Sequence, residues 1–382
     1  MVDSTGKSAS AEMDMGSDAK VGLNPISAIL GGSGPPWLQN VLVGAVIAFA
    51  ISLPFMVDSN RWLTLFTIVL IYVVLASGLN IVVGMTGLLD LGYVAFYAIG
   101  GYYTSIIFIQ VLKNAWGMDL SQAWWLLWVN LLLGGIIAAA AGAVLGYPTL
   151  RLRGDYLAIM TLGFHEIIRI IANNWVGLTR GPSGISGIPG PALFGFEFSN
   201  QFRLYYVALA LGILSVFVIS RLVRSRIGRA WAAIREDEVA AEAMGINTSH
   251  YKLLAYAAGG FFAGVMGVFL AHYMNFIHPS NFQLMESILV VCLVVLGGMG
   301  NVAGPVLGAV VWVSLQEWLR DFEFIQHHPE VRGMTMGLVL VTLMVFRPQG
   351  ILGSRRVALE MRPGTEAELE HEREEVADVF ER

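Results

Sequence analysis

Three polar side chains share one face of an otherwise apolar segment. Glu166, Arg169 and Asn173 stand three and four residues apart within residues 155–177, a spacing that a helix would bring to the same side. Ionisable groups inside a membrane are functional candidates, and an acid next to a base can form a neutral pair. The three are therefore candidates for a transport pathway, with two interpretations. They could contact a solute, or they could form an ion pair that holds the helix in place, which the spacing favours.

A glycine-rich stretch at residues 84–92 adds three more pathway candidates. Asn80 and Thr86 would either face a pathway or form hydrogen bonds between helices. Asp90 would either line a cytoplasmic exit or, in the favoured interpretation, cap the following helix. A faintly similar stretch at 297–305 joins two later apolar segments. Such glycine density lets backbones approach closely or lets a helix break.

The polar loop at residues 221–250 reads RLVRSRIGRAWAAIREDEVAAEAMGINTSH. Acids at 236–238, an alanine-rich run and then Gly245 predict a short capped helix, and one of residues 247–249 would cap the next long helix. Such a helix is a good docking element for another protein. The alternative is a positively charged topology loop with an incidental helical turn, and the residues alone do not decide between the two.

Other ionisable and metal-binding side chains give weaker signals. Glu286 lies near the outer end of its apolar segment, where we expect a solvated rim position. His272 and His278 have no ligand partner at a useful spacing. The single cysteine, Cys292, excludes an intrachain disulfide and a cysteine-based zinc site. We therefore expect no metal site.

The elements that position these residues follow from the composition. The 382 residues are 56% hydrophobic and only 13% charged, against about 25% charged in an ordinary soluble domain. This excludes a soluble enzyme, a nucleic-acid binder and a disordered protein. Apolar runs of about 20 residues recur, and lipid offers no partner to backbone polar groups, so helices are expected. The predicted spans are 38–57, 62–83, 88–112, 124–147, 155–177, 203–221, 251–273, 284–299, 302–319 and 332–347.

The fold class is therefore an all-α polytopic membrane protein with about ten transmembrane helices. The richest basic loop, at 221–252, should face the cytoplasm, which places both termini inside (N-in/C-in). The segment 155–177 must then cross the membrane, buried against protein rather than facing lipid. The turn-rich loop at 181–191 should face outward, as a docking site or a plain connector.

Three regions are expected along the chain. Residues 1–36 form a flexible cytoplasmic tail, residues 37–354 a transmembrane permease domain that contains the 221–252 loop, and residues 355–382 an acidic cytoplasmic tail. The N-terminal octet MVDSTGKS resembles a phosphate-binding loop, but it lacks the first glycine and a preceding strand. We therefore expect no nucleotide or other cofactor in this chain.

Several blocks resemble the branched-chain amino acid permeases of ATP-binding cassette (ABC) importers, and are most similar to the LivM-type subunit. EDEVAAEAMGI looks like a diverged form of the "EAA" loop that docks the ATPase in such permeases. GLNIVVGMTGLLDLGYVAFYAIGGYYTSI, PTLRLRGDYLAIMTLGFHEIIRIIANN, LTRGPSGISGIPGP, LVVLGGMGNVAGPVLGA and FRPQGILG match as well. The resemblance extends from about residue 60 to 353 and is specific in order and spacing.

The resemblance implies a translocation subunit in the bacterial cytoplasmic (inner) membrane. Its expected partners are a second permease of the LivH type, two ABC ATPase subunits that use the ATP, an extracytoplasmic substrate-binding protein and the lipid bilayer, with no nucleic acid. The ATPase-coupling residues would be Arg229, Arg235, Glu236, Asp237, Glu238, Ala240, Ala241, Glu242 and Gly245. The candidates for docking the binding protein are Gly181, Pro182, Ser183 and Gly184. Glycine-rich turns would be the flexible points in alternating access.

The cargo and the energy source have alternatives. Asp90, Tyr93 and His165 depart from the usual family pattern, which leaves the substrate open among branched-chain amino acids, other amino acids, urea and short amides. A different class is an ion-coupled secondary transporter that uses Glu166 or Glu286 as a proton site. Uptake driven by ion gradients without ATP would identify that class.

Overall fold

The computed structural model describes residues 36–57, 59–115, 117, 126–149, 152, 154–193, 196–197, 200–321, 329–346 and 350–352. The expected tails at 1–36 and 355–382 therefore lie outside the described residues, apart from Pro36. The basic residues Arg151, Arg153 and Arg347 lie outside them too.

Each predicted apolar segment contains a helix in the described part of the chain. The long helices are α2 (Pro36–Met56), α3 (Asn60–Asn80), α4 (Val94–Ser105), α5 (Leu126–Thr149), α6 (Asp155–Asn174), α8 (Gln201–Arg224), α11 (Thr248–Met274), α12 (Leu284–Gly297), α13 (Ala303–Arg320) and α15 (Pro329–Phe346). Helix α3 runs on into the π-helix η1 (Ile81–Met85), and α4 into η2 (Ile106–Ala115).

Short elements connect the long helices. They are α7 (Val176–Thr179), η4 (Gly181–Ser183), β1 (Ile185–Ser186), β2 (Ala192–Leu193), β3 (Phe196–Glu197), α9 (Arg226–Glu236), α10 (Glu238–Ala243), β4 (Phe276–Ile277) and η5 (Pro279–Phe282). Strand β1 pairs antiparallel with β4, Ile185 opposite Ile277, and β2 pairs antiparallel with β3.

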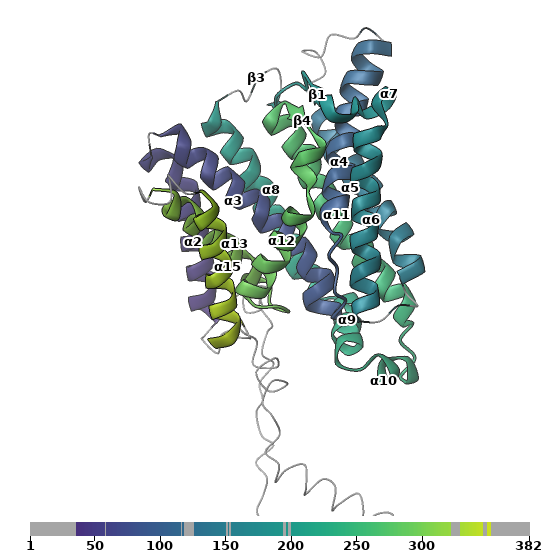
Figure 1. Ribbon diagram of the computed structural model, residues 1–382. Helices are drawn as coiled ribbons and strands as arrows, with labels where there is room; N and C mark the ends of the chain where they lie inside the picture. The colour runs from purple at the N-terminus through teal and green to yellow at the C-terminus, as the bar shows by residue number, and fades with distance from the viewer. Residues whose placement is uncertain are drawn as a thin grey trace, which may run out of the picture.

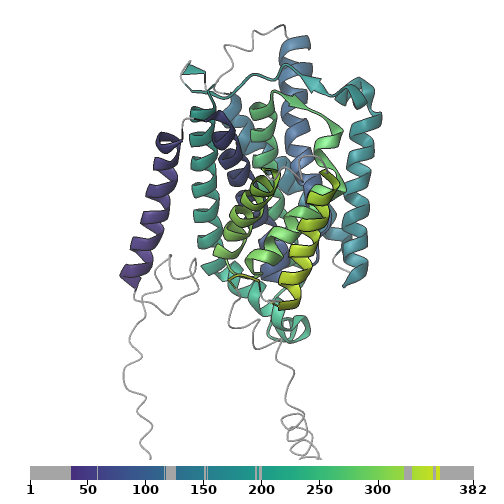
Figure 2. The ribbon, with the colours of Figure 1, turned by 60° about the vertical axis from the view of Figure 1, so that its left-hand side comes forward.

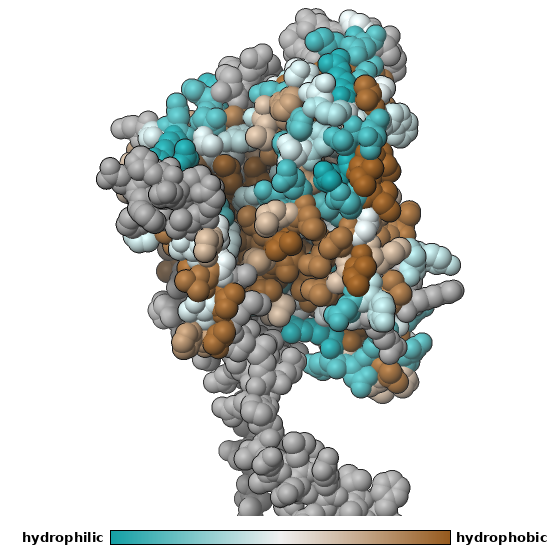
Figure 3. All heavy atoms as spheres, viewed as in Figure 1, coloured by the Kyte–Doolittle hydropathy of each residue, from teal (hydrophilic) through white to brown (hydrophobic). Residues whose placement is uncertain are grey.

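The molecule has the hydropathy of a polytopic membrane protein. Six described helical segments are long and apolar enough to cross a membrane: Asn60–Met85, Val94–Asn114, Leu126–Pro148, Gln201–Arg224, Thr248–Met274 and Pro279–Gly297. Hydrophobic side chains gather across the middle of the face in Figure 3, and hydrophilic ones gather toward its two ends. This distribution is expected when the middle of a bundle lies in lipid.

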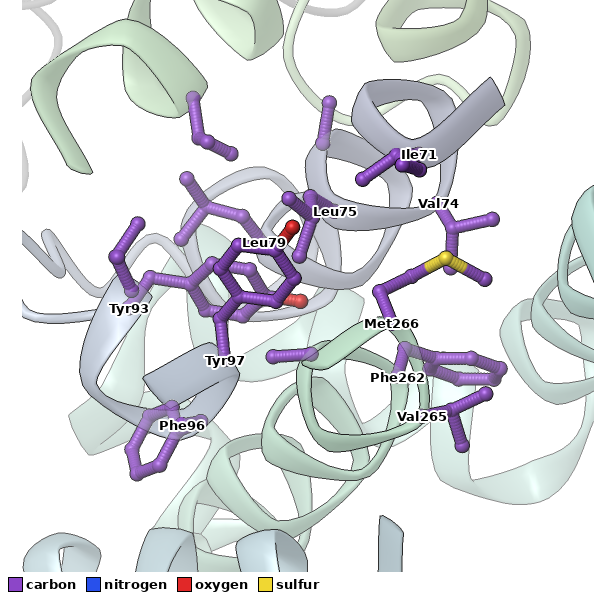
Figure 4. Close-up of a cluster of buried hydrophobic side chains, with 14 of the residues drawn as sticks. Ile71, Val74, Leu75, Leu79, Tyr93, Phe96, Tyr97, Phe262, Val265 and Met266 are labelled. Carbon is purple, nitrogen blue, oxygen red and sulfur yellow. The ribbon is translucent and has the colours of Figure 1, made fainter. Parts of the chain in front are cut away.

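Helix α11 forms the centre of the bundle. It packs most extensively against α5 and α4, and it also contacts α3. Phe262, Val265 and Met266 of α11 meet apolar side chains of α3 and α4 in one buried cluster (Figure 4). The close approach of α11 to α5 requires Gly264, because a Cβ atom there would lie 2.6 Å from the carbonyl oxygen of Gly134. Small residues allow such contacts between membrane helices.

The predicted span 88–112 is wrong at its first residues. Helix α4 begins only at Val94, and none of residues 87–93 is helical. The glycine-rich stretch at 84–92 therefore breaks the helical path after η1. Half of residues 86–93, among them Asp90 and Gly92, are buried, so part of this irregular backbone lies inside the protein, where other parts of the chain can supply its hydrogen-bond partners.

The expectation that residues 155–177 are buried against protein rather than facing lipid is met on only one face of the helix within this chain. Helix α6 lies at the edge of the bundle (Figure 1). One face, with Leu157, Thr161 and His165, is buried, whereas Tyr156 and Ile159 are exposed by 74% and 66%. Apolar residues on the exposed face give α6 a surface suited to lipid or to a second membrane protein.

The polar loops occupy opposite ends of the bundle. Figure 1 places α9 and α10 at the lower end, whereas β1 and β4 lie toward the upper end. Helix α2 stands at the edge (purple in Figure 2), where the Tyr205 hydroxyl of α8 donates to the Ala50 carbonyl at 2.7 Å. The 221–250 loop and the 181–191 loop therefore face different sides of the molecule.

Candidate functional site

The loop predicted to dock another protein folds into α9 and α10. Asp237 caps α10, because its Oδ1 atom accepts the backbone N–H of Val239 at 2.8 Å. Gly245 ends the turn after α10 with a φ of +86°, a conformation that favours glycine. Asn247 caps α11 by accepting the N–H of His250 at 3.1 Å. The predicted short capped helix is therefore confirmed.

Two contacts fasten this α9–α10 segment to α11. The fully buried Trp231 of α9 donates from Nε1 to the Tyr251 carbonyl at 2.8 Å. Lys252 Nζ lies 2.6 Å from Glu238 Oε1, and only 5% of the Lys252 side chain is exposed. Ala241 packs inward as well, since it is 4% exposed. A force on the α9–α10 segment would therefore be transmitted to α11.

The expected ATPase-coupling residues divide between the surface and these anchoring contacts. Arg229, Glu236, Asp237, Ala240, Glu242 and Gly245 are exposed. Arg235 and Glu238 are half-buried, and Ala241 is buried. The sequence interpretation missed Val239 and Met244, which are exposed by 64% and 84%. The available signal was that these two are the larger apolar residues in the stretch 237–245, whose other apolar residues are alanines and a glycine.

A polar junction joins α9 to the two glycine-rich stretches. Arg235 Nη1 donates to the Gly84 carbonyl at 2.5 Å. The Asn80 side chain donates to the Asn301 carbonyl at 2.9 Å and accepts the Gly300 N–H at 3.1 Å. We call these five residues the Asn80 junction. Asn80 thus binds the turn between α12 and α13 rather than another helix, and the junction brings together stretches about 220 residues apart.

Thr86 and Asp90 lie on the broken path between η1 and α4. The Thr86 hydroxyl donates to the Val82 carbonyl at 2.6 Å, a bond within its own turn rather than between helices. Asp90 is fully buried, and its Oδ1 atom accepts the Gly92 N–H at 2.8 Å. The residue that precedes α4 is Tyr93, so Asp90 does not cap the helix. Its full burial also keeps it from lining an open exit in this structure.

Hydroxyl groups from two other helices hold the backbone of this segment. The Leu91 N–H donates to Thr161 Oγ1 of α6 at 3.0 Å. The Ser287 hydroxyl of α12 donates to the Leu91 carbonyl at 2.6 Å. Both hydroxyl-bearing residues are fully buried. The irregular segment is therefore fixed between α6 and α12, a role that sequence reasoning did not assign to either residue.

Glu166 and Arg169 form the predicted ion pair on α6. Arg169 Nε donates to Glu166 Oε2 at 2.9 Å, and a second guanidinium nitrogen contacts the same carboxylate. The two partners lie on one helix and each side chain is 37% exposed, so this pair does not fasten α6 to a neighbour. Asn173 lies half-buried one turn further on. Their role in a pathway remains a prediction.

The loop at 181–191 is held to the end of α11. His278 Nε2 donates to the Pro182 carbonyl at 2.8 Å, and β1 pairs with β4. Of the four docking candidates, Pro182 and Ser183 are exposed, whereas Gly181 and Gly184 are buried. Only the first two can therefore offer side chains to another protein, and the glycines shape the turn.

Glu286 does not occupy the expected solvated rim. It lies half-buried in the first turn of α12, where its Oε2 atom accepts the Tyr72 hydroxyl at 2.7 Å. His272 is buried, and its Nδ1 atom donates to the Pro189 carbonyl at 2.7 Å. In the described part of the chain, no group of three or more His, Cys, Asp or Glu side chains is arranged to hold a metal ion.

Comparison with known proteins identifies the type of machine to which these features belong. The sequence model of the family described as "Branched-chain amino acid transport system / permease component" matches residues 61–344. The chain belongs to this permease family. The match begins in α3 and ends in α15, so it includes the Asn80 junction and the α9–α10 segment.

The permease relatives include LivM and LivH subunits. The LivM permeases of the high-affinity branched-chain amino acid transport systems of Salmonella typhimurium and Escherichia coli are each 41% identical over 349 residues, 85% of this chain and 78% of the relative. The LivH permease of Salmonella typhimurium is 27% identical over 300 residues, 75% of this chain and 92% of the relative. No solved structure matches the chain. A multi-pass transport permease thus accounts for the helices and for the exposed polar segment.

Proposed function

We propose that the chain is the LivM-type membrane subunit of an ABC importer for branched-chain amino acids. A LivH-type permease would complete the membrane part, and two ABC ATPase subunits would hydrolyse the ATP. A binding protein outside the membrane would deliver the amino acid. Identity to LivM permeases supports the subunit type, and the presence of LivM and LivH relatives in one organism supports the pairing.

The observation that carries this proposal is the α9–α10 segment. It presents exposed apolar side chains, Val239 and Met244, yet it is anchored by Trp231 and by the Lys252–Glu238 ion pair. A docking element that drives transport must bind a partner protein through exposed side chains, and it must also move together with the membrane helices. This segment meets both requirements, so the ATPases would dock here.

Motion of α9 would pass to the helices through Arg235. Its guanidinium contacts the Gly84 carbonyl in η1, directly before the irregular segment at 86–93. π-helical turns are frequent at functional sites, and irregular backbone inside membrane transporters usually borders a cavity. We infer that ATP-driven displacement of the α9–α10 segment reorients α3 and α4 about this break, which gives alternating access.

The proposed arrangement in the membrane has ten crossings and both termini in the cytoplasm. Six basic residues at 221–252 place the α9–α10 end in the cytoplasm, so Pro182 and Ser183 would face the binding protein outside. Helix α12 has 14 residues and therefore a length of only about 21 Å, so it crosses together with η5 rather than alone. The compartment would be the bacterial inner membrane.

The test is transport by the reconstituted complex. The chain is purified with a LivH-type permease and both ATPases, placed in liposomes that contain ATP, and supplied with binding protein and labelled leucine. We expect accumulation of leucine that requires ATP hydrolysis and every subunit, and no accumulation of labelled urea.

Each alternative gives a different result in the same assay. ATP-dependent uptake of urea instead of leucine would retain the machine and overturn the cargo. Leucine uptake driven by a proton or sodium gradient, in liposomes that hold this chain without ATPases, would overturn the ABC assignment. Liposomes with ATP replaced by a non-hydrolysable analogue serve as the control for energy coupling.

A further inference from the structure

A cavity of about 230 Å³ lies between α3, α4, α11 and α12. It is several times larger than the roughly 30 Å³ that one water molecule occupies in the liquid. Most of its wall is apolar, with Ile68, Ile71 and Leu75 from α3, Leu270 from α11 and Val290 from α12. Figure 4 shows Ile71 and Leu75 of α3 together with Tyr97 of α4, which also lines the cavity. Such walls suit an aliphatic group.

One charged group faces this apolar space. Glu286 lines the cavity, and among the described residues its hydrogen-bond partner is the neutral Tyr72 hydroxyl, which donates at 2.7 Å. The ion pairs found in the described part of the chain do not include Glu286. A half-buried carboxylate beside an apolar wall gains most from a positively charged partner with N–H donors. The cavity therefore has a cation-binding position beside an aliphatic compartment.

The cavity lies next to the irregular segment that precedes α4. Val94, the first residue of α4, lines it, and the next residue after Glu286 is Ser287, which binds the Leu91 carbonyl of the irregular segment. The N-terminus of α4 carries partial positive charge from the helix dipole, and this charge favours the nearby Glu286 carboxylate. A small molecule here would touch the segment that we expect to move during transport.

We infer that this cavity is a substrate site within the permease, where Glu286 binds the ammonium group of an aliphatic amino acid and the apolar wall holds its side chain. The inference rests on the proposed function and adds a binding position to it. An acyl chain would gain nothing from the Glu286 carboxylate, and neutral urea would gain nothing from the aliphatic wall. The combination of the two selects a cationic group attached to a small hydrocarbon.

Direct labelling tests the site without the binding protein. The purified permease–ATPase complex is irradiated with photo-leucine, a diazirine analogue of leucine, and the labelled peptides are mapped by mass spectrometry. We expect labels on α3, α4, α11 or α12 at the cavity. Isoamylamine, which keeps the ammonium group, should suppress labelling, whereas isocaproate, which lacks it, should need at least about a tenfold higher concentration, as for loss of a charge-assisted hydrogen bond.

A variant pair tests Glu286 in the same preparation. Glu286→Gln should lower labelling at the cavity and ATP-dependent leucine uptake by about tenfold or more, with ATPase subunits still bound. The matched control is Glu317→Gln, because Glu317 is also a half-buried glutamate but pairs with Arg61 and does not line the cavity. This control should retain labelling and uptake.

The outcomes separate this inference from the proposed function. Leucine uptake by the unaltered complex without labels at the cavity, or equal competition by isocaproate and isoamylamine, would overturn the site and leave the importer assignment standing. Absence of ATP-dependent leucine uptake by the unaltered complex would overturn the importer assignment itself. The competition experiment uses the unaltered protein, so it decides the matter even where Glu286→Gln fails to fold.

Discussion

Lys252 lies near the start of an apolar helix, yet its side chain is almost entirely buried. A buried ammonium group is tolerated only with a partner, and here the partner is the half-buried Glu238 carboxylate. Removing one member of such a pair leaves the other uncompensated, which costs more than removing both. The Glu238 position in the coupling loop therefore has a structural role as well as any contact with an ATPase.

Glu238→Gln should destabilise the protein by about 2 kcal/mol, because it leaves Lys252 without a counter-charge. The midpoint of thermal unfolding in detergent measures the effect. Glu242→Gln is the matched control, since Glu242 is exposed on the same helix. The double variant Glu238→Gln, Lys252→Met should recover most of the loss. Equal midpoints for Glu238→Gln and Glu242→Gln would show that the ion pair does not stabilise the fold.

Arg235→Ala should separate ATP hydrolysis from transport. Loss of its charge-assisted hydrogen bond to the Gly84 carbonyl, about 1.5–3 kcal/mol, predicts at least about a tenfold fall in leucine uptake with the ATPases still bound. The measurement compares uptake with ATP hydrolysis in the same liposomes. Arg226→Ala, at an exposed arginine of the same helix, should change neither. Parallel loss of uptake and of bound ATPases would instead make Arg235 a docking residue.

Residues close in sequence were easier to predict than residues brought together by folding. The Glu166–Arg169 pair and the capped α10 helix follow from local spacing and are both present. The Tyr72–Glu286 hydrogen bond joins side chains 214 residues apart, so the sequence could not identify the cavity that they line. Val239 and Met244 were missed because exposure depends on which face of α10 packs inward.

At the scale of elements, hydropathy predicted where helices occur, but it placed the start of α4 at residue 88 rather than at Val94. The apolar run at 88–112 includes residues that the fold uses as irregular backbone, because Thr161 and Ser287 supply hydrogen bonds from other helices. Hydropathy also could not show that the apolar face of α6 is exposed, because exposure depends on which helices pack against it. The sequence shows that a residue is apolar, but the packing of the helices decides whether that residue is buried within the chain or exposed on its surface.

Gly264→Val should destabilise the α5–α11 contact. Its side chain would meet the Gly134 backbone, and such overpacking costs about 1–3 kcal/mol. The yield of monodisperse protein and its midpoint of thermal unfolding should both fall. Gly163→Val on α6 is the matched control, because a Cβ atom there would have no neighbour within 4 Å. Equal behaviour of the two variants would show that close approach of α5 and α11 is not required.

The whole molecule has its polar loops at two opposite ends, which allows the orientation to be tested in cells. In a Cys292→Ser background, Met244→Cys and Ser183→Cys place single thiols in α10's turn and in the 181–191 loop, both exposed. A membrane-impermeant maleimide should label position 183 in intact spheroplasts and position 244 only after lysis. The reverse pattern would invert the proposed topology.

The backbone at Leu91 has a consequence for how the helices move. Its N–H depends on a hydroxyl of α6 and its carbonyl on a hydroxyl of α12, and both of the residues that carry these hydroxyls are fully buried. A shift of α6 against α12 by more than an ångström or so would strand a peptide group, at a cost of a few kcal/mol. The two helices are therefore mechanically coupled through Leu91. The motion with the lowest free-energy cost moves α6, the irregular segment and α12 together as one rigid body relative to the remainder of the bundle.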